Sequence, residues 1–190
     1  MVVLAAGVAM IIAAAVALRL RAQHRHRKTE RLQRKFGSEY GGAIENAGRK
    51  KGEAGLAKRE ERVEGFDLRP LSASESERFT GLWTATQTRF VDEPGGAVTD
   101  AGRLLSEVMQ ARGYPASNFE QRAEDISVNH PQFVANYRAA NAQAIKHSKG
   151  EASTEDLRQA MVHYRWLFND LVGTLDTAET PEPELSATAR

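Results

Sequence analysis

The 190-residue sequence contains no cysteine. This absence excludes disulfide bonds, thiol catalysis and cysteine-ligated metal sites, and it fits a protein of a reducing compartment. The Gly-x-Ser-x-Gly motif of the common hydrolase elbow is missing, as is the Glu-x-x-His pair of di-metal helical bundles. The sequence therefore predicts no cofactor, no metal and no catalytic residue.

Charge is absent from the start of the chain, because residues 2–18 form an unbroken run of 17 apolar or small side chains. As a helix this run is about 26 Å long, against a bilayer core of about 30 Å. No polar residue recurs at helical spacing within it, which argues against a helix lying on a membrane surface. No basic residue precedes the run, and the residues after it form a poor cleavage site. We expect a transmembrane helix over residues 1–20, with a cleaved export signal and a buried core helix as the alternatives.

A dense group of basic residues follows the apolar run. We call five of them, which are expected to contact the membrane surface, the basic segment: Arg19, Arg21, Arg25, Arg27 and Lys28. The positive-inside rule then places the chain after the helix in the cytoplasm, with the N-terminus outside the inner membrane. The same charges favour a bilayer with anionic headgroups. His24 and His26 lie among these cations, which repel a metal ion, so we expect a solvated basic face there.

The net charge of +1 hides a strong asymmetry. Residues 19–62 carry 14 Lys and Arg against 6 Asp and Glu, whereas residues 63–190 carry 12 against 19. A basic region could bind nucleic acid, but no motif of a nucleic-acid reader accompanies it. The charges of residues 19–62 are therefore expected to face lipid.

Residues 21–66 are expected to form a basic helical stem. Apolar residues recur there every fourth position, which predicts a narrow helical stripe of Leu32, Phe36, Tyr40 and Ile44. Several glycines oppose a continuous helix, and we expect two helices with a break near residues 37–42.

Residues 67–173 predict a bundle of four to five helices, so the expected fold class is all-α. Ser72 with Glu75, and Ser153 with Asp156, form capping-box patterns, and Pro94 and Pro131 suit first helical turns. The most regular apolar stripe runs from Leu157 to Leu171. No segment shows the alternation of a strand. Residues 174–190 contain few large apolar residues and are expected to be disordered.

Two places in the bundle are candidates for a site. The segment around Tyr114, Pro115 and Phe119 joins two expected helices and is a possible interaction loop, although both rings could instead cover the core. His130 lies near Glu124 and Asp125, which suggests an enzyme site, but we expect both carboxylates to face solvent on a helix.

The stretches "RPLSASESERFTGLWTATQTRFVDEPGGAVTDAGRLLSEVMQARGYP", "FEQRAEDISVNHPQFVANYRAAN" and "GEASTEDLRQAMVHYRWLF" resemble a bacterial family with an N-terminal membrane segment and a helical C-terminal domain. The resemblance implies no activity, cofactor or site residue. The sequence as a whole predicts a membrane-anchored, non-enzymatic protein that presents a cytoplasmic helical domain to a protein partner, for interaction or scaffolding. The alternatives are an exported, envelope-facing domain and an enzyme with a site near His130.

Overall fold

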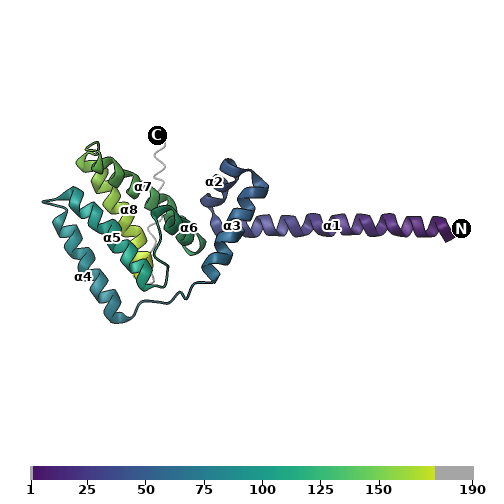
Figure 1. Cartoon of the computed structure of the whole chain (residues 1–190), viewed down its shortest axis with the longest axis horizontal. Helices are drawn as coiled ribbons and strands as arrows, with labels where there is room; N and C mark the ends of the chain where they lie inside the picture. Colours follow the sequence, from purple (N-terminus) through teal and green to yellow (C-terminus); the bar gives the residue numbers. More distant parts are fainter. Residues whose placement is uncertain (1, 174–190) are drawn as a thin grey trace, which may run out of the picture. The chain divides into compact units, whose positions relative to one another are not determined.

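The computed structural model describes the backbone of residues 2–173 and the side chains of residues 15–173 (Figure 1). This part of the chain forms helices and no strands, which confirms the all-α class. The helices are α1 (Val2–Phe36), α2 (Ser38–Ala47), α3 (Arg49–Glu64), α4 (Ala73–Arg89), α5 (Pro94–Ala111), α6 (Phe119–Asn129), α7 (Pro131–Ser148) and α8 (Thr154–Val172). The tail that the sequence predicts to be disordered, residues 174–190, lies outside the described residues.

The contacts divide the chain into two compact units. The first unit contains residues 1–65 and 120–134, and so holds α1, α2, α3 and α6. The second unit contains residues 66–119 and 135–190, and holds α4, α5, most of α7 and α8. The sequence placed α6 within the bundle segment 67–173, whereas its contacts group it with the stem helices.

In the first unit, α2 and α3 pack beside the C-terminal end of α1 (Figure 1). Of the four residues in the predicted stripe, Leu32, Phe36 and Tyr40 are buried and Ile44 is half-buried. The chain breaks at Gly37 (φ 51°), within the expected region, but it breaks again at Gly48 (φ 75°). Positive φ angles are cheap for glycine alone, so these two positions end helices while other stem glycines do not. The stem therefore contains three helices and not the two expected.

The contact between α2 and α3 depends on Gly52. This residue is buried in α3, and a Cβ atom added to it would lie 2.6 Å from the carbonyl oxygen of Ala43 in α2. The side chain of Glu53 adds polar links, because it accepts hydrogen bonds from the hydroxyls of Thr29 (2.7 Å) and Tyr40 (2.9 Å). Glu53 thereby joins α3 to both α1 and α2.

The second unit follows its local sequence signals closely. Ser72 with Glu75 and Ser153 with Asp156 form complete capping boxes, and Pro94 occupies the first turn of α5. The expected stripe of α8 is buried along its whole length: Leu157, Ala160, Met161, Tyr164, Leu167, Phe168 and Leu171. Trp83 of α4 stacks on Phe168 of α8, with ring centroids 4.7 Å apart and planes 14° apart. Apolar burial thus holds α4, α5 and α8 together.

Among the residues whose side chains are described, no helix combines the length and the apolarity needed to cross a membrane. The transmembrane helix predicted over residues 1–20 is therefore not supported by that part of the chain. Residues 1–14 of this predicted span lie outside the described side chains, although the backbone of α1 is helical from Val2.

The Gly52 contact can be tested with a matched pair of glycines in α3. Gly52→Ala should destabilise the protein by about 1–3 kcal/mol, because the new methyl group meets backbone that cannot rotate away. Gly55 has nothing within 4 Å of an added Cβ, so Gly55→Ala should stabilise the helix by about 0.5–1 kcal/mol. Chemical unfolding followed by circular dichroism measures both, and equal effects would contradict a close α2–α3 approach.

Candidate membrane-facing and protein-interaction surfaces

The described part of α1 before Thr29 is exposed throughout. Every side chain from Ala15 to Lys28 lies in solvent. Val16, Leu18 and Leu20 are large apolar residues, yet they expose 50%, 65% and 60% of their surface. Fully burying such a side chain is worth about 1.5–3 kcal/mol. No described residue covers these three side chains, so contact with another apolar surface would stabilise this stretch.

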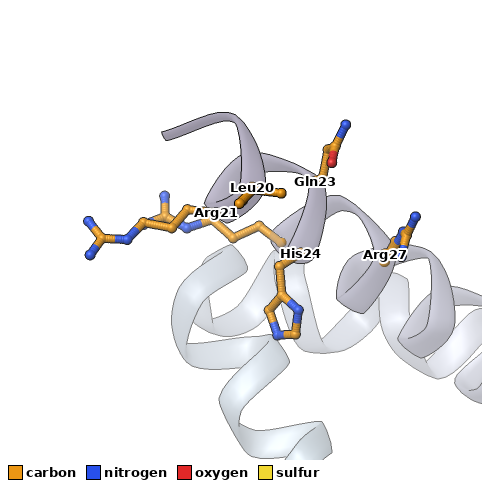
Figure 2. A pocket seen from close by; sticks show the side chains of 6 residues that line it. Leu20, Arg21, Gln23, His24 and Arg27 are labelled. Atoms are coloured by element: carbon orange, nitrogen blue, oxygen red, sulfur yellow. The ribbon is translucent and has the colours of Figure 1, made fainter. Parts of the chain in front are cut away.

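The basic segment surrounds α1 on all sides. At about 3.6 residues per turn, its five side chains point in directions spread around the whole circumference of the helix. None of them forms an ion pair with a described residue. Glu30, the nearest acidic residue in the sequence, instead lies 3.3 Å from the ring of His26. Figure 2 shows a shallow hollow along this stretch, where Gln23 and His24 point to different sides. A single helix lines the hollow, so it is not an enclosed ligand site.

Two helices meet at Glu60, a carboxylate buried in α3. Its oxygens accept hydrogen bonds from Arg31 at 2.7 and 2.8 Å and from Lys35 at 2.7 Å, both on α1. Burial acts to raise the pKa of Glu60, but the hydrogen bonds from Arg31 and Lys35 outweigh it and lower the pKa from its usual value. Glu60 is therefore an ionised anchor for the C-terminal end of α1.

A second set of ion pairs joins α3 to α6. Arg59 binds Glu124 at 2.8 Å, while Arg62 binds Glu124 at 3.1 Å and Asp125 at 2.7 Å. Asp125 also accepts a hydrogen bond from Gln121 at 2.9 Å. We call these contacts, together with those of Glu60, the α3 ion-pair network. Through it α3 holds both α1 and α6.

The network overturns the expectation that Glu124 and Asp125 face solvent. Asp125 is only 2% exposed, and Glu124 is half-buried against the arginines. The partners lie more than 60 positions away, so helical periodicity within α6 could not reveal them. The available signal was the three-residue spacing of Arg59 and Arg62, which places two cations on one face of α3.

The predicted enzyme site near His130 has its carboxylates engaged elsewhere. His130 lies half-buried between α6 and α7, where its backbone N–H donates to Ile126 at 2.8 Å. The nearby carboxylates of Glu124 and Asp125 are bound to arginines of α3. Within the described residues, no three metal-ligating side chains lie close enough to hold an ion. The structure thus offers His130 no carboxylate from this pair for acid–base work.

The predicted interaction loop is held against the core. Tyr114 is 4% exposed, and its ring lies edge-on to Phe66 with centroids 6.2 Å apart. Phe119 is half-buried and lies 4.7 Å from the ring of Tyr137. Of the three predicted contact residues only Pro115 is exposed. The two rings cover the core, which is the alternative that the sequence left open, so the loop offers a partner little aromatic surface.

Two open depressions flank α4 in the second unit. One, of about 290 Å³, lies between α4 and α5. Of its four charged lining residues, Asp100 pairs with both Arg89 and Arg103, and the fourth is Glu107. The other, of about 130 Å³, lies between the end of α4 and the middle of α8, and we call it the α4–α8 groove. The α4–α8 groove is lined by Gln87, Phe90, Arg158, Met161, Val162 and Arg165.

No family model, curated protein or solved structure matches this chain. The family resemblance noted in the sequence therefore stays a prediction. The function has to be argued from the exposure, charge and contacts of the residues described above.

The α3 ion-pair network predicts a large effect of removing one buried partner. Arg62→Met should lower the free energy of unfolding by roughly 2–3 kcal/mol, because it leaves Asp125 charged and buried with only Gln121 beside it. Arg158 forms a solvent-exposed pair with Glu155, so Arg158→Met should leave stability almost unchanged. Chemical denaturation of both variants gives the comparison. Similar losses would show that burial of the Arg62–Asp125 pair contributes nothing.

Glu60 predicts a pH-dependent contribution to stability. Its pKa is lower in the folded than in the unfolded protein, so its contribution is fully present above the unfolded value of about 4.3 and is lost as the pH falls through the folded value. Glu60→Gln should therefore cost about 1–2 kcal/mol at pH 7 and progressively less below about pH 4. Exposed Glu61, changed to Gln, is the control, and a Glu60→Gln deficit that stays constant down to about pH 3 would refute the assignment.

Proposed function

We propose that this chain is a single-pass membrane protein that holds its helical second unit at the cytoplasmic face, where it binds another protein. The observation that carries the proposal is the exposed apolar surface of Val16, Leu18 and Leu20, followed directly by the unpaired basic segment. Lipid covers the first group, and lipid headgroups neutralise the second. The proposal locates the membrane boundary on α1 near Arg19.

The apolar run of residues 2–18 supports a span in this position. It contains no charged side chain, and α1 is helical from Val2, so after the first turn its backbone N–H groups bond within the helix. At about 26 Å the run is slightly shorter than the bilayer core, and arginine side chains at its end can extend toward the headgroups. Anionic lipid adds about 1 kcal/mol for each basic residue near the surface.

The arrangement of charge favours a helix that crosses the membrane over one that lies on it. A surface helix needs one apolar face and one polar face along its length. In α1 the two characters follow each other along the axis, and the basic segment surrounds the helix on every side. The positive-inside rule then gives the cytoplasmic orientation of the chain beyond Arg19.

We propose binding and not catalysis as the role of the tethered helices. One observation supports this: the carboxylates of Glu124 and Asp125 near His130 are bound by arginines of α3. A membrane tether raises the local concentration of a binding surface for partners at the same membrane. Such a tether gives a non-enzymatic helical domain a scaffolding role.

Membrane extraction tests the anchor. The wild-type protein should stay in the membrane pellet after alkaline carbonate and high salt, because a span is held by apolar burial. Ile11→Arg combined with Ile12→Arg should move it to the supernatant, since each arginine costs about 2.5–3.5 kcal/mol at a helix centre. Arg49→Gln, a charge change outside the apolar run, is the matched control. Release of the wild type by salt alone would refute the span and leave only a peripheral, charge-driven association.

A further inference from the structure

The α4–α8 groove is lined by apolar residues and by two cations. We call its apolar lining residues, Phe90, Met161 and Val162, the floor; Met161 is buried and the other two are half-buried. Arg158 and Arg165 stand seven residues apart on α8, which places them on one face of the helix and about 10.5 Å apart along its axis. Met161 and Val162 fall between them on the same face. The order along α8 is therefore cation, apolar pair, cation.

The α4–α8 groove is lined by two arginines and no acidic residue, whereas the depression between α4 and α5 is lined by two arginines and two acidic residues. Arg165 is exposed and forms no ion pair with any residue that the structure describes. Arg158 binds Glu155 at 2.7 Å, one turn away at the start of α8. Arg89, Asp100 and Arg103 in the other depression are already paired among themselves. Arg165 thus leaves the α4–α8 groove with one unpaired positive charge beside its apolar lining residues, within a chain region that is acidic overall.

We propose that the α4–α8 groove binds an acidic amphipathic helix of a partner protein. Two carboxylates seven residues apart on that helix match Arg158 and Arg165, and leucine-like side chains at the intervening third and fourth positions contact the floor. Helices that lie in apolar grooves use this i, i+3, i+4, i+7 set of anchors. The proposal rests on the proposed function and names the chemistry of its partner.

A peptide partner fits the groove better than a lipid surface does. Anionic membranes attract clusters of several cations, as in the basic segment. The groove has two arginines separated by apolar side chains. This pattern favours a ligand that carries two negative charges at the same spacing with apolar side chains between them. Shape and charge together give specificity for such a ligand.

The test uses the full-length protein in detergent and a fluorescein-labelled helical probe peptide of about 16 residues, long enough to form a helix. The probe carries glutamates at positions i and i+7 with leucines at i+3 and i+4. A second peptide has glutamine in place of both glutamates, and a third has lysine. Fluorescence anisotropy gives the dissociation constants, and circular dichroism verifies that each protein variant is folded. Since Arg165 is exposed and unpaired, Arg165→Glu should fold normally.

The wild type should bind the glutamate peptide at least about fivefold more tightly than the glutamine peptide, the size expected for exposed charge pairs. Arg165→Glu should abolish that preference and favour the lysine peptide, while Arg103→Glu on α5 should behave as wild type. The proposal would be overturned if all three peptides bound equally, or if both variants had the same effect. Binding of phosphatidylserine vesicles through Arg165 would also overturn it. None of these measurements depends on membrane topology. A negative peptide result therefore does not contradict the proposed membrane anchor, and a negative extraction result does not contradict peptide binding.

Discussion

The proposed role of this protein depends on one constraint: apolar and basic side chains follow each other along a single helix. Val16, Leu18 and Leu20 are poorly solvated by water, whereas the basic segment is costly to move into hydrocarbon. No described residue covers either group. In the proposed function, a membrane boundary near Arg19 meets both conditions, and the positive-inside rule then places the remaining helices on the cytoplasmic side.

Within the first unit, α3 contacts its neighbours through ion pairs as well as through buried apolar residues. Glu60 binds α1, while Arg59 and Arg62 bind α6, a helix whose neighbours in sequence belong to the second unit. Buried ion pairs add little net stability compared with apolar packing, because desolvation offsets most of the attraction, but leaving one partner unpaired is costly. The α3 ion-pair network therefore makes the pairing of α3 with α6 specific. Residues 67–173 alone would lack the arginines that neutralise Asp125, so the bundle segment and the stem depend on each other.

Local signals in the sequence were sufficient for most of the helices but not for their ionic contacts. The capping boxes at Ser72 and Ser153 and the stripe of α8 involve residues within a few positions of each other, and all of them are confirmed. The break at Gly48 was missed because composition does not reveal which glycine adopts a positive φ angle. The burial of Asp125 was missed because its partner Arg62 is distant in sequence, and long-range pairing leaves no periodic trace. For the same reason the α4–α8 groove, formed by helices separated by three others, was not predicted.

The absence of native cysteine permits a direct test of membrane orientation, because single engineered thiols can be labelled without background. Ala142 is exposed on α7, and a cysteine there adds only a sulfur atom. In intact spheroplasts, Ala142→Cys should resist a membrane-impermeant maleimide and react only after lysis, whereas Val2→Cys should react without lysis. Labelling of Ala142→Cys from outside intact cells would contradict the cytoplasmic orientation and with it the proposed role of the basic segment.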